Sequence, residues 1–215
     1  MLRFANPLLK AIFVIALLNC LYAGAASAST VLEMSFAQVV EHSELVFEGR
    51  VQSVEPQILG DGRIYTFVEF EILDVVKGAY TDTQIQLSFL GGELAGKGMF
   101  VTDMKIPLVG ETGLYFVESL SQAQVNPFVG WSQGHYLIET LPDNSRVVTT
   151  VANETVIALD APTSQAPTTS AMNSFSKGKA KGVLIQQQNQ LSALSQALSV
   201  EQFKAAVRDV AEQAR

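Results

Sequence analysis

The sequence predicts a mainly β protein: an antiparallel sheet, closed or nearly closed into a barrel, with a short N-terminal helix, a long Gly-rich loop and a C-terminal helical tail. Three observations predict this class. Apolar and polar residues alternate in strand-length segments between residues 45 and 159. Gly, Pro and Asp separate these segments at regular intervals. Almost no helical pattern lies between them, which disfavours a parallel sheet with helical crossovers.

Residues 1–28 have the three parts of a secretory signal peptide. Arg3 and Lys10 are basic, residues 11–18 are apolar, and residues 26–28 form a small-x-small cleavage motif. The apolar run is shorter than the ~20 residues that cross a membrane, so we expect no membrane span after cleavage. Lipidation of Cys20 is the alternative, disfavoured because Asn19 rather than a small residue precedes it. The sequence therefore predicts an exported protein, periplasmic or secreted.

The first helix is predicted by its N-terminal signals. Ser35 and Gln38 have the spacing of a capping box, in which each side chain bonds the backbone N–H of the other residue. Met34 and Val39 stand at the positions of a hydrophobic staple. We expect a short helix that ends near residues 41–43.

The first two strands show the clearest alternation. Leu45, Phe47 and Val51 share one face of the first strand, where Gly49 predicts a bulge or sharp bend and Pro56 an end. A turn over residues 60–63 leads to a strand at 64–77 that ends at a Lys-Gly pair. The remaining strands are expected at 84–89, 114–117 (continuously apolar and therefore central), 128–131, 135–140, 146–150 and 155–159.

One connection, residues 91–110, is long and holds five glycines. Loops of this length in a compact domain are commonly functional or mobile. The alternative is a loosely packed cover over one end of the barrel. If the loop is functional, Gly91, Gly92, Met99 and Phe100 are the candidate binding residues.

Composition and charge exclude several classes of function. The chain has 14 basic and 21 acidic residues, a net charge of -7, and the acidic excess lies in residues 29–160, with 6 basic and 18 acidic residues. Nucleic-acid binding needs clustered cations and is therefore not expected. One Cys excludes a disulfide framework and a Cys-based zinc site, and two His leave little for a metal. We expect no metal and no cofactor.

The C-terminal part is predicted to be separate. Residues 161–182 are rich in Pro, Ser and Thr and predict a flexible linker. Residues 183–215 predict a helical tail, with a second capping box at Ser199 and Gln202 and apolar residues at helical spacing after it. We expect this amphipathic tail to dock on the barrel, or on a second copy of itself, and the barrel to fold without it.

Residues 130–134 match the G-x-S-x-G motif of serine hydrolases, with Ser132 as the nucleophile and His135 close by. That mechanism needs a strand before the serine and a helix after it. A strand pattern follows here, and an adjacent His in extended chain points away from the serine. Trp131 stands among Phe128, His135 and Tyr136, a cluster that we interpret as core, with a binding rim as the alternative.

Four stretches, residues 43–54, 65–78, 89–92 and 130–134, resemble a recurrent kind of exported bacterial protein. The first two also resemble the opening strands of netrin-like and tissue-inhibitor-of-metalloprotease domains. That resemblance implies an OB-type five-stranded barrel, which we expect over residues 29–160. Inhibitors of that family act through an N-terminal Cys and are held by disulfides. The chain after residue 28 has no Cys, so the resemblance carries no site over.

These observations favour a non-enzymatic exported module that binds an unknown protein or small ligand, with no catalytic residue. Two alternatives remain: an inhibitor of a secreted protease, which rests on the family likeness, and a hydrolase that uses Ser132. OB barrels bind on one sheet face and in neighbouring loops. The candidate binding residues are therefore those of the two regions above: Gly91, Gly92, Met99, Phe100, Trp131, Ser132 and His135.

Overall fold

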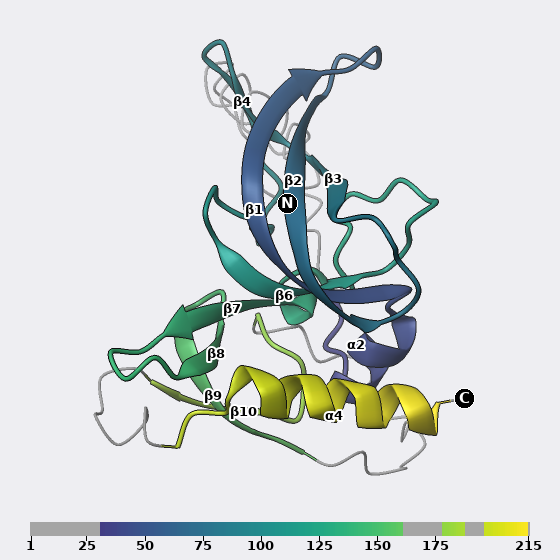
Figure 1. The fold of residues 1–215 in the computed structure, drawn as a ribbon. Coiled ribbons are helices and arrows are strands. Elements are labelled where there is room, and N and C mark those ends of the chain that lie inside the picture. Colours follow the sequence, from purple (N-terminus) through teal and green to yellow (C-terminus); the bar gives the residue numbers. More distant parts are fainter. Residues whose placement is uncertain (1–30, 161–177, 188–195, 215) are drawn as a thin grey trace, which may run out of the picture.

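The computed structural model describes residues 31–160, 178–187 and 196–214 (Figure 1). The predicted signal peptide and most of the predicted linker lie outside these ranges. In chain order the elements are α2 (Phe36–His42), β1 (Leu45–Ile58), β2 (Ile64–Lys77), β3 (Gln84–Leu90), β4 (Gly92–Leu94), β5 (Lys97–Met99), β6 (Thr112–Val117), the 3-10 helix η1 (Trp131–Gly134), β7 (His135–Thr140), β8 (Arg146–Thr150), β9 (Glu154–Leu159), β10 (Val183–Gln187) and α4 (Val200–Gln213).

The mainly β class is confirmed. Eight strands form one antiparallel sheet in the order β10-β9-β8-β7-β6-β1-β2-β3, and β4 and β5 form a separate hairpin. Among the described residues β3 and β10 are the edges of the sheet, and no strand pairing closes it into a ring. The predicted closed barrel is therefore not confirmed, because no strand pairs across the two edges of the sheet in the described residues.

An irregular segment, residues 125–129, lies between the β3 edge and β6. Leu90 N–H donates to Val125 O at 2.9 Å, and Val129 N–H donates to Phe116 O at 2.9 Å. Phe128 forms an isolated antiparallel bridge with Val117. The predicted strand at 128–131 is thus wrong beyond this one bridge, because the chain turns into η1 at Trp131.

Two strands, β1 and β6, separate two hydrophobic cores. Successive strand residues point to opposite faces, so Leu114 and Phe116 enter one core while Tyr115 and Val117 enter the other. Burial on both faces explains why consecutive residues of β6 are apolar. The second core, on the side of β2 and β3, contains Leu45, Phe47, Val51, Val68, Phe70, Ile85, Leu87, Phe89, Tyr115, Val117 and Phe128.

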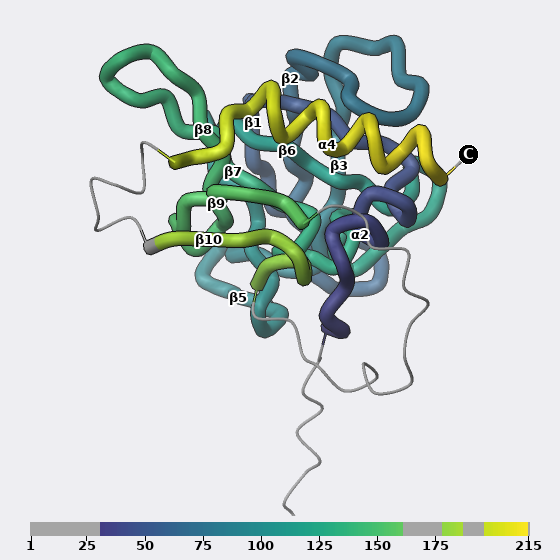
Figure 2. The backbone as a smooth tube through the Cα atoms, turned by 90° about the horizontal axis from the view of Figure 1, so that it is seen from below, coloured from purple at the N-terminus to yellow at the C-terminus, as the bar shows by residue number. Residues whose placement is uncertain are grey.

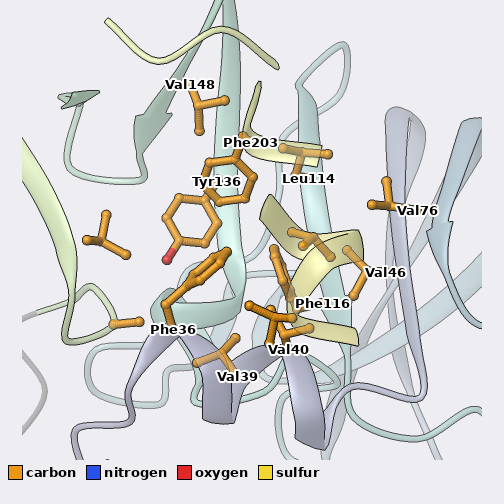
Figure 3. Close-up of a cluster of buried hydrophobic side chains, with 14 of the residues drawn as sticks. Phe36, Val39, Val40, Val46, Val76, Leu114, Phe116, Tyr136, Val148 and Phe203 are labelled. Atoms are coloured by element: carbon orange, nitrogen blue, oxygen red, sulfur yellow. The ribbon is translucent and has the colours of Figure 1, made fainter. Parts of the chain in front are cut away.

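The first core lies between the sheet and the two helices (Figure 3). Phe203 of α4 is fully buried there, with its ring centroid 4.9 Å from that of Tyr136 and 5.4 Å from that of Phe36. Figures 1 and 2 both place α4 beside α2. The helix is therefore part of a main core and not an appended tail.

Both predicted capping boxes are confirmed. Gln38 N–H donates to Ser35 Oγ at 3.1 Å, and Ser35 N–H donates to Gln38 Oε1 at 2.8 Å. The same reciprocal pair joins Ser199 and Gln202 at the start of α4. These bonds satisfy backbone donors that the first helical turn leaves without partners.

The predicted helix before Ser199 is wrong at residues 183–187, which form strand β10. This segment pairs with β9 in antiparallel register, with Val183 opposite Leu159. Val183 is buried in the first core, whereas Leu184 points away and is 47% exposed. An edge position on the sheet gives this apolar stretch both backbone partners and burial, which an isolated helix there lacks.

The strand predictions for the N-terminal half hold with two corrections. The pairing of β1 with β2 shifts register at Gly49, as expected for a bulge, and an added Cβ there lies 2.6 Å from the Phe47 ring. Strand β1 continues through Pro56 to Ile58. Proline is tolerated because β6 pairs only with residues 45–50 of β1, so the later part has a free edge. The predicted loop at 91–110 contains the β4–β5 hairpin.

We expect Phe203→Ala to lower the free energy of unfolding by about 3–5 kcal/mol, because it removes a buried ring from the first core. The matched control is Phe100→Ala, since Phe100 is 79% exposed and its loss is expected to cost less than about 0.5 kcal/mol. Urea unfolding of the full chain measures both. Equal stabilities for the two variants contradict the assignment of α4 to the core.

Candidate functional site

An open pocket of about 450 Å³ lies on the α4 side of the sheet. Strands β1, β2, β6, β7 and β8 form its floor and α4 forms one wall. Its lining is charged and polar with little apolar surface. The lining residues are Glu48, Arg50, Leu73, Asp74, Thr112, Ile138, Thr140, Arg146 and Lys204.

Strand periodicity explains why these side chains meet. Glu48 and Arg50 are two residues apart on β1 and share a face. Thr112 lies opposite Arg50 in the β1–β6 pairing, and Thr140 lies opposite Arg146 in the β7–β8 pairing. The same face is apolar beneath α4, so the pocket begins where the helix no longer covers the sheet.

Lys204 is the central cation of the site. Its side chain is 5% exposed, and Nζ contacts the carboxylates of Glu48 and Asp74, the second at 3.0 Å. Burial lowers the pKa of Lys204, but hydrogen bonds to Glu48 and Asp74 and the charges of these carboxylates outweigh it, so the pKa lies above its usual 10.5. Lys204 is therefore positively charged at neutral pH.

Two arginines extend this network from opposite sides. Arg146 Nη2 bonds Glu48 Oε1, so each oxygen of the buried Glu48 carboxylate has a cation. Arg208 Nη2 lies 3.1 Å from Asp74 Oδ2, the oxygen that Lys204 also contacts. Buried charges are tolerated only when they are paired in this way.

Arg50 differs from the other cations of the pocket. Its Nε donates a long, 3.4 Å bond to Thr112 Oγ1. Within the described part of the chain, no carboxylate lies at ion-pair distance from its guanidinium. Glu71 lies opposite Arg50 in the β1–β2 pairing, but its Oε2 accepts a bond from Gln52 Nε2 at 2.8 Å. The two carboxylates that line the pocket, Glu48 and Asp74, are paired with other cations, so Arg50 is the lining cation without an ion pair among the described residues.

The first predicted binding region lies away from this pocket. Gly92 pairs with Met99 across the β4–β5 hairpin, and Gly91 N–H donates to Ile64 O at 2.7 Å. Phe100 follows the hairpin and is largely exposed. The structure thus brings Gly91, Gly92 and Met99 together, but through backbone pairing rather than around a cavity.

The second predicted region contains His135, which is buried at the start of β7. His135 Nε2 lies 2.7 Å from Glu111 Oε1, and Tyr115 donates its hydroxyl to the same oxygen at 3.1 Å. The Tyr115 and Phe128 rings pack on the imidazole, with centroids 5.2 and 5.3 Å away. Burial and the Glu111 charge raise the pKa of Tyr115 above its usual 10.0. His135 thus forms its side-chain hydrogen bond with Glu111 inside an aromatic cluster.

Ser132 lies in η1, which strand β7 follows directly. The strand-serine-helix order of a hydrolase elbow is therefore not present at this motif. Trp131, at φ 58°, is half-buried and belongs to neither hydrophobic core, so the interpretation as core is wrong for this residue. Phe128 and Tyr136 of the same predicted cluster are fully buried in the two cores.

Gln133 gives the motif a structural role. Its fully buried amide accepts a bond from Met34 N–H at 2.7 Å and donates to Leu32 O at 2.9 Å. Gly134 is needed because an added Cβ lies 2.6 Å from Val129 O. The turn thus holds the strand-like segment before α2 in place.

Arg50, Arg146 and Lys204 are not among the binding residues predicted from the sequence. One signal was available for Lys204, which follows Phe203 and stands within one turn of Val200 and Val207, on a helix whose apolar face is buried. A charge at that place predicts a buried acidic partner. No local pattern indicates that Glu48 is that partner.

Comparison with known proteins gives no relative: no protein-family model, curated protein or solved structure matches the chain. Within the described ranges no three or more His, Cys, Asp or Glu side chains gather as metal ligands. None of the helices described here has the length and apolar character needed to cross a membrane.

We expect Glu48→Gln to destabilise the fold by about 3 kcal/mol, because it leaves the buried Lys204 without its main counter-charge. Glu201→Gln is the matched control: Glu201 also pairs with Lys204, at 3.5 Å, but is 72% exposed and is expected to contribute less than about 1 kcal/mol. Urea unfolding at pH 7 measures both. A loss at Glu48 no larger than that at Glu201 contradicts a buried network.

The raised pKa of Lys204 predicts a specific dependence on alkaline pH. A pKa raised on folding gives stabilisation that is complete below the unfolded value, 10.5, and is lost as pH rises through the folded value. The stability of the natural chain relative to Lys204→Met should therefore be constant at pH 7–9 and fall above about pH 10.5. Unfolding of both proteins across this range measures the difference. Parallel profiles up to pH 11.5 contradict it.

Proposed function

We propose that the protein is a non-enzymatic exported binding module that takes a small ligand in the pocket between α4 and the sheet. The convergence of Arg50, Arg146 and Lys204 on one open pocket carries this proposal. Their positions come from three separate elements, β1, β8 and α4, whose packing holds the side chains in place. Binding sites are commonly concave and use a few placed polar groups of this kind.

The pairing of the charged groups supports binding rather than catalysis. Catalysis by a lysine as base or nucleophile needs a lowered pKa, whereas the pKa of Lys204 is raised. Both oxygens of Glu48 are occupied by cations, so this carboxylate is poorly placed to accept a proton from a substrate.

We also propose that residues 45–129, a part of the predicted 29–160 barrel domain, form an OB-like barrel related to netrin-like domains. In support, β1 pairs with both β2 and β6, β2 pairs with β3, and residues 125–129 hydrogen-bond to β3 and β6. These five segments surround the second hydrophobic core. An OB-fold is a five-stranded, partly open barrel, so an irregular fifth segment is compatible with it.

A blocking variant tests the binding function. Succinate, inorganic phosphate, glucose and putrescine, each at about 5 mM, represent anionic, neutral and cationic ligands. Thermal melting of the full chain should rise with at least one class, by mass action on the folded state. Thr140→Trp should abolish the rise, because Thr140 is exposed and its replacement fills the pocket.

The control is Thr81→Trp, an exposed threonine in the β2–β3 connection that does not line the pocket. This variant should keep the ligand response of the natural chain. If no ligand class raises the melting temperature, or if both tryptophan variants respond as the natural chain does, the proposed function is wrong.

A further inference from the structure

We infer that the pocket ligand carries a small oxyanion, a carboxylate or a phosphate, held by Arg50 and Arg146 beside Lys204. This inference rests on the proposed function and assigns its ligand class. It follows from the charge left over in the pocket, the unused hydrogen-bond donors and the size of the space.

The carboxylates of the pocket are already neutralised. Glu48 has Arg146 on one oxygen and Lys204 on the other. Asp74 receives both Lys204 and Arg208 on Oδ2. An incoming anion therefore meets acids whose charge is compensated, and it does not have to displace an ion pair to reach Arg50.

The lining residues carry three positive and two negative charges, a net of +1, in a chain with a net charge of -7. Arg50 and Arg146 are two of only six basic residues between residues 29 and 160, which also contain 18 acidic residues. Both line this one pocket, and the C-terminal helix adds Lys204 to it. The site is thus a local concentration of cations on an acidic protein.

The donors fit an oxyanion. A guanidinium has five N–H donors in a planar fork that matches carboxylate or phosphate oxygens. Arg146 is 39% exposed and uses Nη2 for Glu48, and Arg50 uses Nε for its long bond to Thr112. The Thr112 hydroxyl lines the pocket and accepts that bond, which does not use its own O–H.

The volume limits the rest of the ligand. About 450 Å³ of open space accommodates a small molecule. Leu73 and Ile138 are the apolar lining residues, enough to contact a short carbon chain and too few to cover a lipid tail. A long polyanion is disfavoured because the surrounding chain is acidic.

Calorimetric titration of the full chain at constant ionic strength tests this assignment. The probes are succinate, inorganic phosphate and succinamide, the neutral amide of succinate with a similar shape. We expect succinate or phosphate to bind and succinamide not to bind. Arg50→Gln should weaken anion binding about tenfold or more, as expected for loss of a charge-assisted hydrogen bond, without unfolding the protein, because Arg50 has no ion pair to lose in the described structure.

Arg63→Gln is the matched control, since Arg63 is an exposed arginine in the β1–β2 turn, and it should change the affinity less than about twofold. Succinate binding alone identifies a carboxylate ligand, and phosphate binding alone a phosphate ligand. Succinamide binding as tightly as succinate, or an Arg50→Gln variant with natural affinity, overturns the inference. If neither anion binds in this titration but glucose or putrescine raises the melting temperature and Thr140→Trp abolishes that rise, this inference fails and the proposed function stands. If no probe binds, both fail.

Discussion

The whole structure depends on two strands, β1 and β6, being buried on both faces at residues 45–47 and 114–117. Their alternate side chains enter two different cores, one enclosed with β2, β3 and residues 125–129, the other closed by α2 and α4. A strand of this kind must be apolar on consecutive residues, because neither face reaches water. Helices α2 and α4 and strands β2 and β3 are placed by which of these two faces they cover.

Helix α4 links this packing to the candidate site. Its buried side includes Phe203, which closes the first core, and the next residue, Lys204, which meets Glu48 and Asp74 at the edge of that core. A buried ammonium is tolerated only with paired acids, so docking of the helix and assembly of the charged pocket are one event. The cations that support the proposed ligand site are therefore positioned by the same contacts that stabilise the fold.

Local signals explain which predictions hold. Both capping boxes and the bulge at Gly49 depend on residues close in sequence, and the structure contains each of them. The predicted sites at residues 91–100 and 130–135 depend on a long Gly-rich loop and on a G-x-S-x-G motif beside an aromatic cluster. Those residues instead serve backbone pairing, as at Gly92 and Met99, and a tight turn, as at Gly134. A glycine needed for close backbone approach cannot be distinguished, from the local sequence, from a glycine that contacts a ligand.

By itself, the sequence determined the mainly β class, the capped helices, most strands and the acidic character of the chain, because alternation, caps and composition are local properties. Only the tertiary structure decided the strand order, the two cores, the place of β10 at the edge of the sheet and the meeting of the pocket charges. Arg146 is 98 residues from Glu48, and Arg208 is 134 residues from Asp74. The Glu48 pairing is favoured by the cost of burying an unpaired charge. This cost acts only when segments far apart in the sequence meet during folding, so it leaves no periodic pattern in the sequence.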